Sequence, residues 1–88
     1  MKDKVLVKLI VPEIDKTFDL FVPVNEIIWK IKKLMIKSIS DITNIPLIAY
    51  DCSLISKDTG KIYANNQLII DTDIRNGSEI VLLFRKNM

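Results

Sequence analysis

The period of the hydrophobic pattern changes at Pro23, and this change constrains the fold more than any other feature of the chain. Residues 17–22 place an apolar side chain at every second position, which is typical of a half-buried β-strand. Over residues 25–39 the apolar side chains instead recur with the period of about 3.6 that indicates an amphipathic helix. Proline has no amide proton for a strand ladder, so it separates the two elements. The sequence therefore predicts a strand that leads directly into a helix.

Another strand precedes this one. Residues 4–11 are rich in β-branched side chains, and lysines at Lys4 and Lys8 mark a solvent-facing side. The buried side then holds Val5, Val7, Leu9 and Val11. In residues 17–22 the inward side chains are Phe18, Leu20 and Val22, with Asp19 outward. The polar residues 12–16 make the reversal, so we expect two antiparallel strands.

The helix face that we expect to contact the core is centred on Ile31. At about 100° per residue, this face includes every residue within about 60° of Ile31. Its members are Val24, Ile27, Ile28, Leu34, Met35 and Ser38. Asn25 is the expected N-cap, and the carboxylate of Glu26 suits the positive first turn.

The segment after the helix gives the weakest pattern. Residues 41–44 are compatible with one more turn, whereas residues 45–50 fit either a strand or a packed loop. Residues 54–63 predict a tight hairpin with Gly60 at a position of positive φ. A short irregular or 3₁₀ segment is expected to pack Leu68, Ile69 and Ile74 against the core.

The last strand, predicted over residues 79–85, starts from an Asn76-Gly77 turn. Alternation places Ile80, Leu82 and Phe84 on the buried side, and Val81 and Leu83 on the opposite side. A right-handed crossover through the helix makes the first and last strands parallel neighbours in the middle of the sheet.

These elements together predict an α+β fold of the β-grasp type. A mixed sheet of four to five strands would carry one helix packed across it. At 88 residues the chain has room for a single domain, residues 1–88. The N-terminal apolar run, residues 5–11, is too short to span a membrane, so the chain is expected to be cytoplasmic.

The residue types that catalysis and metal binding require are scarce. The chain has no histidine, one cysteine and two glycines, so it lacks an imidazole base, a zinc ligand set and a phosphate-binding loop. Cys52 has neither a basic neighbour nor a helix N-terminus in its local sequence, so we expect a half-buried small side chain rather than a nucleophile. The sequence predicts a protein that is not an enzyme and that takes no metal, cofactor or small-molecule substrate.

The charge distribution says less about function than the missing catalytic residue types do. The 13 basic and 11 acidic side chains leave a net charge of +2, too little to indicate a nucleic-acid surface by itself. The helix, however, carries Lys30, Lys32, Lys33 and Lys37. They are interpreted first as a solvated helix face, and alternatively as a weak binding site for nucleic acid or another anionic surface.

A first candidate interaction surface lies on the outer side of the helix. On the same projection Trp29 falls about 160° and Ile36 about 140° from Ile31, and Lys33 lies between them in the sequence at helical spacing. Trp29, Lys33 and Ile36 are therefore expected to form an outward ridge. Three interpretations stay open: the stem of Lys33 packs on Trp29, residues 40–52 cover the ridge, or the ridge binds a partner or a second copy of the chain.

A second candidate surface lies on the sheet face that points away from the helix. Val81 and Leu83 would share this face with Leu6 and Ile10 of the first strand. Single exposed aliphatic residues are ordinary, but a contiguous cluster of four indicates protein binding.

Several of these motifs resemble those of ubiquitin-like proteins, most closely over residues 67–85. Within that group the chain resembles the small ubiquitin-like component of type VII (WXG-type, ESX-like) secretion systems, the YukD/EsaB-like family. Three features carry this resemblance: Phe18-Asp19-Leu20 followed by Val22-Pro23 and the helix, Lys57-Asp58-Thr59-Gly60-Lys61, and Ile74-Arg75-Asn76-Gly77.

The resemblance implies a cytoplasmic accessory or regulatory subunit without catalytic residues. Its partner would be a membrane-embedded secretion ATPase or channel subunit, which would hold the protein peripherally at the membrane. An adaptor role in another pathway is the alternative. No glycine follows Gly77, so the conjugation or sulfur transfer that a Gly-Gly tail supports is not expected.

Overall fold

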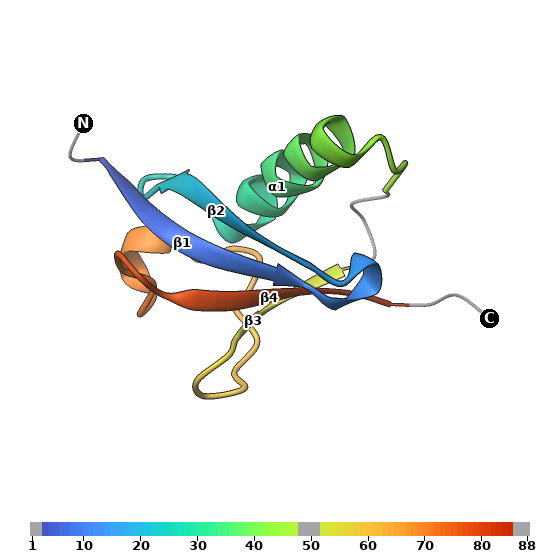
Figure 1. Cartoon of the computed structure of the whole chain (residues 1–88). Helices are drawn as coiled ribbons and strands as arrows, with labels where there is room; N and C mark the ends of the chain where they lie inside the picture. The colour runs from blue at the N-terminus through green and yellow to red at the C-terminus, as the bar shows by residue number, and fades with distance from the viewer. Residues whose placement is uncertain (1–2, 48–51, 86–88) are drawn as a thin grey trace.

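Two antiparallel strands, β1 (Lys4–Val11) and β2 (Lys16–Pro23), begin the fold as the alternating pattern predicted. They pair from Lys4 opposite Pro23 to Val11 opposite Lys16. A single 3₁₀ turn, η1 (Pro12–Ile14), connects them, and Asp15 in the left-handed region, with φ of 55°, completes the reversal. The computed structural model describes residues 3–47 and 52–85 (Figure 1).

The helix α1 (Ile28–Thr43) begins and ends later than the predicted residues 25–39. Asn25 is not the N-cap; Ile27 holds that position in an extended conformation. The carbonyl oxygens of Val24 and Glu26 accept hydrogen bonds from residues 70 and 69, at 2.9 and 3.0 Å. Residues 24–26 form a turn and a bend that these bonds hold in place, and Ile27 is bridged to Leu68, so the helix begins only at Ile28.

At its C-terminus, α1 continues through residues 41–43, in agreement with the additional turn with which the sequence of residues 41–44 is compatible. Asn44 caps the helix in the left-handed region, with φ of 58°, and its N–H donates to the carbonyl of Ser40 at 2.8 Å. Of residues 45–50, only 45–47 lie within the described chain, and they form no regular element.

The second half of the chain completes a sheet whose described strands are four, in the order β2-β1-β4-β3. The strands β3 (Cys52–Ser56) and β4 (Glu79–Phe84) pair antiparallel, whereas β1 and β4 pair parallel in the centre as predicted. The predicted hairpin is present as a single bridge between Ile55 and Ile62, with Gly60 at φ of 74°. A 3₁₀ turn, η3 (Ile69–Asp71), occupies the segment where one was expected.

The helix packs across one face of the mixed sheet, and among residues 3–47 and 52–85 no α-helix lies on the other face, which we call the uncovered face (Figure 1). The inward-facing strand residues are those that the alternation predicted, including fully buried Leu9 and Leu82. No helix of the described residues is long and apolar enough to cross a membrane.

The orientation of α1 about its own axis differs from the prediction. The buried helix residues are Ile28, Ile31, Lys32, Met35, Ile36 and Ile39. On the helical projection their centre lies about 70° from Ile31, toward Ile36. Leu34, predicted to be buried, is 51% exposed, and Ser38 is exposed as well. Compared with the prediction, the helix is rotated so that the side carrying Ile36 faces β3 and Leu47. The side carrying Leu34, near the β2 edge of the sheet, is left exposed.

Candidate functional site

The uncovered face of the sheet carries an apolar patch built from three strands. Ile10 of β1 lies opposite Val81 of β4 in the parallel register, and Val81 lies opposite Ile55 of β3 in the antiparallel register. Leu83 follows Val81 on the same side of β4 and is 44% exposed. We call Ile10, Ile55, Val81 and Leu83 the outer-sheet patch.

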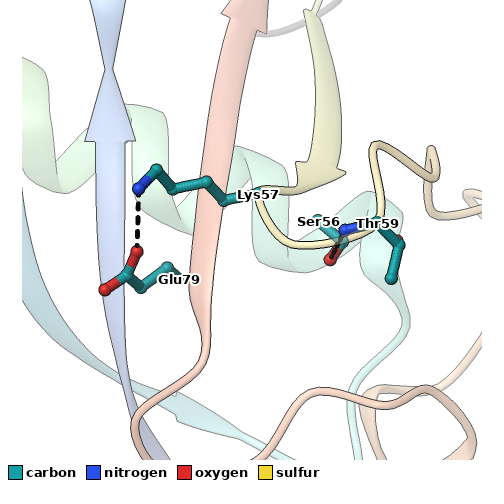
Figure 2. A network of polar contacts seen from close by, with 4 residues as sticks. All are labelled: Ser56, Lys57, Thr59 and Glu79. Atoms are coloured by element: carbon teal, nitrogen blue, oxygen red, sulfur yellow. Dashed lines mark hydrogen bonds and ion pairs between the residues drawn. The ribbon is translucent and has the colours of Figure 1, made fainter.

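A row of alternating charges borders this patch. Lys8 lies opposite Asp19 on β2 and opposite Glu79 on β4. The ammonium of Lys57, just past β3, is 3.3 Å from the carboxylate of Glu79 (Figure 2). Asp19, Lys8, Glu79 and Lys57 thus follow one another across the sheet. Their exposure makes each pair worth little in stability, but charges beside an apolar patch favour one orientation of a partner.

A short turn fixes the direction in which the chain leaves Lys57. The Thr59 N–H donates to the hydroxyl of Ser56 at 3.3 Å (Figure 2). The Gly60 N–H donates to the Ser56 carbonyl at 2.9 Å. In addition, the N–H of Lys57 itself donates to the carbonyl of Glu79 at 3.1 Å. The two residues of the ion pair, Lys57 and Glu79, are therefore also held together by a backbone hydrogen bond.

The charged row divides the cluster of four that the sequence predicted. Leu6 lies on the same face as Ile10, but the pair Lys8–Glu79 lies between Leu6 and the outer-sheet patch. The neighbour of Leu6 in the turn before β4 is Gly77, whose N–H donates to the Leu6 carbonyl at 2.8 Å and which offers no side chain. Leu6, 39% exposed, instead lies opposite Phe21, which is 68% exposed. The predicted contiguous cluster was wrong because it ignored strand register.

Sequence reasoning missed two members of this face. Ile55 was assigned only to a hairpin, although its position between Leu54 and Ser56 in a strand indicates the outward side. Phe21 lies between the inward residues Leu20 and Val22, and the same alternation indicates that it points outward.

The helix side of the molecule carries the other candidate residues. Trp29 is 46% exposed, and the ammonium of Lys33 lies over its ring, 4.7 Å from the ring centroid. The charged end of Lys33 therefore contacts Trp29 in a cation–π interaction. Ile36 does not extend the ridge outward: it is only 4% exposed, because α1 is turned so that this side faces the core.

Trp29 and Ile36 nevertheless line the same groove, which has a volume of about 720 Å³. Its apolar lining residues are Trp29, Leu34, Ile36 and Leu47. Its charged lining residues are Glu26, Lys30, Lys33, Lys37 and Asp41.

Lys32 does not belong to the lysine surface. It is 9% exposed, and its ammonium donates to the carbonyl oxygen of Cys52 at 2.9 Å. The prediction that four helix lysines form one surface for anions was therefore wrong about Lys32, which connects α1 to β3. Of these four lysines, Lys30, Lys33 and Lys37 are exposed.

Tyr63 and Asp73 form a hydrogen-bonded pair outside both candidate surfaces. The hydroxyl of Tyr63 donates to the carboxylate of Asp73 at 2.7 Å. Burial, with a further contribution from this hydrogen bond, raises the pKa of Tyr63 to about 12. Cys52 is half-buried, as expected. Residues 3–47 and 52–85 contain no group of three or more acidic, cysteine or histidine side chains suited to a metal ion.

Comparison with known proteins finds similar structures but no similar sequence. No protein-family model and no curated protein matches the sequence. One similar structure is a chain of the MycP5-free ESX-5 inner membrane complex, with a TM-score of 0.80 at 16% identity. The match covers 98% of this protein but only 22% of that chain, so the protein spans about a fifth of its length.

Isolated ubiquitin-like domains match as well. The ubiquitin-like domain of an Arabidopsis thaliana protein gives a TM-score of 0.69 at 22% identity, over 96% of this protein and 80% of that chain. The ubiquitin-like domain of Plasmodium falciparum Dsk2 gives 0.71 at 18% identity, over 93% and 99%. These matches establish the ubiquitin-like β-grasp fold that the sequence predicted.

Proposed function

We propose that this protein is a non-catalytic protein-interaction module and that it acts as an accessory or regulatory subunit of a type VII secretion system. The outer-sheet patch is the observation that carries the proposal. Three strands contribute aliphatic side chains to one uncovered face, and Leu83 alone leaves 44% of its surface in water. Contiguous apolar surface of this kind is typical of protein-binding sites.

The surroundings of the patch suit a specific partner. Lys8 and Glu79 limit it on one side, so a partner must present apolar side chains to Val81 and complementary charges to the row. The isoleucine, valine and leucine side chains of the patch have few rotamers, so they lose less conformational entropy on binding than long polar side chains would.

The secretion assignment is supported by two observations. The first is the resemblance of several motifs, including the Ile74-Arg75-Asn76-Gly77 turn, to those of the small ubiquitin-like components of these systems. The second is the similarity of nearly the whole protein to part of a chain in an ESX-5 inner membrane complex. The proposed partner is accordingly a membrane-embedded ATPase or channel subunit, contacted from the cytoplasmic side.

Affinity capture from detergent-solubilised membranes of the source cells tests this function. The parent protein is expected to retain a secretion ATPase or channel subunit, and Val81→Asp is expected to lose it. Ile70→Asp is the matched control, because Ile70 is 53% exposed and lies in η3, outside the patch. Equal capture by the parent and Val81→Asp would contradict the assigned surface.

An adaptor role in another pathway is the second candidate. The likeness to ubiquitin-like domains from Arabidopsis thaliana and Plasmodium falciparum favours it. In that case the same experiment would capture soluble proteins through the patch and no membrane subunit. The genes adjacent to this one would also lack a membrane ATPase and WXG proteins.

A further inference from the structure

A groove lies along the exposed side of α1, on the other side of the molecule from the outer-sheet patch. The helix covers the inner face of the sheet, so its solvent side and the outer face of the sheet point in opposite directions (Figure 1). Leu47, beyond the end of α1, lines the groove together with the helix residues. A ligand here would leave the outer-sheet patch free.

Three exposed lysines follow the groove in a helical stripe. Lys30, Lys33 and Lys37 are separated by three and four positions, so they lie on one side of α1. At 1.5 Å per residue the stripe is about 10 Å long. Glu26 and Asp41 lie at its two ends, and the Lys37–Asp41 pair, at 3.8 Å, is exposed and therefore weak. The middle of the groove is thus positively charged.

Large apolar side chains lie beside these lysines. Trp29 and Leu34 are 46% and 51% exposed, and Ile36 lies deeper at 4%. The ammonium of Lys33 lies over the Trp29 ring, where a carboxylate of a partner could pair with it, and Trp29 still keeps exposed surface for an apolar contact. Tryptophan next to a cation in a concave site is a common centre of binding energy.

We propose that this groove binds an acidic amphipathic helix of a protein partner. Apolar side chains of that helix would contact Trp29 and Leu34, and its acidic side chains would meet Lys30, Lys33 and Lys37. A helix suits the site because the backbone groups of α1 are already paired within α1. The groove offers no strand edge, so the bound segment must satisfy its own backbone hydrogen bonds.

The geometry favours a protein helix over a lipid surface. The carboxylates of Glu26 and Asp41, at the two ends of the groove, would face lipid phosphates on a flat membrane. Ile36, within the groove, is almost fully covered and does not project toward a bilayer. The site goes beyond the proposed function, because it uses a different face of the protein.

Trp29 is the only tryptophan of the chain, so its fluorescence reports directly on the groove. The experiment titrates the full chain with an amphipathic peptide of about 18 residues, with leucine on one face and glutamate beside it. Binding is expected to shift the Trp29 emission to shorter wavelength, with saturation, and to make the peptide helical by circular dichroism. A peptide with glutamine in place of glutamate is expected to bind at least about tenfold more weakly.

Two double variants distinguish binding through the groove lysines from non-specific attraction by the net charge of the protein. Lys30→Glu/Lys33→Glu is expected to weaken binding at least about tenfold. Lys16→Glu/Lys61→Glu changes the net charge equally at exposed positions outside the groove, and is expected to bind like the parent. Thermal melting confirms that both variants are folded. Equal losses in the two variants, or equal binding of the glutamine peptide, would overturn the proposal.

Vesicles of phosphatidylserine and phosphatidylcholine provide the third arm. A Trp29 shift with vesicles and none with the acidic peptide would assign the groove to membranes and overturn the proposal. Val81→Asp is expected to bind the peptide like the parent. Val81→Asp changes the outer-sheet patch and leaves the groove intact. Its capture of the secretion subunit therefore tests the proposed function, and its binding of the peptide tests the groove proposal separately.

Discussion

The side-chain oxygen of Asn76 accepts a hydrogen bond from the backbone N–H of Leu6 at 2.8 Å. The next residue, Gly77, donates its N–H to the carbonyl of the same leucine, also at 2.8 Å. The turn before β4 therefore holds both backbone groups of one residue in β1. These two bonds fix the parallel register in which Ile10 lies opposite Val81, and so position the outer-sheet patch.

Removal of the Asn76 side chain should loosen this register. Asn76→Ala is expected to lower the free energy of unfolding by about 1 kcal/mol, the usual net value of one hydrogen bond. Asn76→Asp keeps an oxygen acceptor and should lose less. Urea denaturation of the parent and both variants measures the difference. Equal stability of all three proteins would show that the bond to Leu6 contributes nothing.

Two helix substitutions test the rotation of α1. Ile36→Ala is expected to cost about 2–4 kcal/mol, because it deletes a side chain that is 4% exposed in the core. Leu34→Ala should stay within about 1 kcal/mol of the parent, because Leu34 is 51% exposed. Denaturant unfolding of both variants decides between the observed orientation and the one centred on Ile31. The reverse order of stabilities would contradict the structure.

Lys32 should behave as a structural residue. Lys32→Met keeps the aliphatic stem in place but removes the ammonium that donates to the Cys52 carbonyl. The expected loss of stability is about 1–2 kcal/mol. Lys30→Met, at an exposed position, is the control and should leave the melting temperature nearly unchanged. A loss confined to the Lys30 variant would be incompatible with the observed contact.

Tyr63 makes stability depend on pH in the alkaline range. Burial and the Asp73 hydrogen bond raise its pKa from 10.0 to about 12, so the folded state favours the neutral phenol. Its contribution to stability is fully present below pH 10.0 and is lost as the pH rises to about 12. Relative to Tyr63→Phe, the parent should lose up to about 2 kcal/mol across this window. Parallel dependence on pH in the two proteins would contradict this account.

The strands and turns could be predicted from the sequence because they follow from local chemistry. Alternation alone placed Leu9 and Leu82 inward, and Gly60 adopts the positive φ that its turn requires. The start of α1 could not be predicted in this way. It depends on hydrogen bonds from residues 69 and 70 to Val24 and Glu26, which are distant in sequence.

The candidate surfaces also combine features that local sequence predicts with features that depend on contacts distant in sequence. Alternation correctly placed Val81 and Leu83 on one side of β4, but the position of Leu6 relative to them depends on the parallel register. Helical periodicity showed a ridge at Trp29 and Lys33. It could not show that Ile36 is buried, because the rotation of a helix depends on which strands it covers.

Site-specific photocrosslinking tests the central claim, that the outer-sheet patch contacts a membrane subunit of a secretion system. A photoreactive phenylalanine analogue would replace Leu83 in the patch, and Ile70 in a control protein, in the source cells. We predict a covalent adduct with a secretion ATPase or channel subunit from position 83 and none from position 70. Adducts from position 83 with soluble proteins alone, or the same adducts from both positions, would contradict the account.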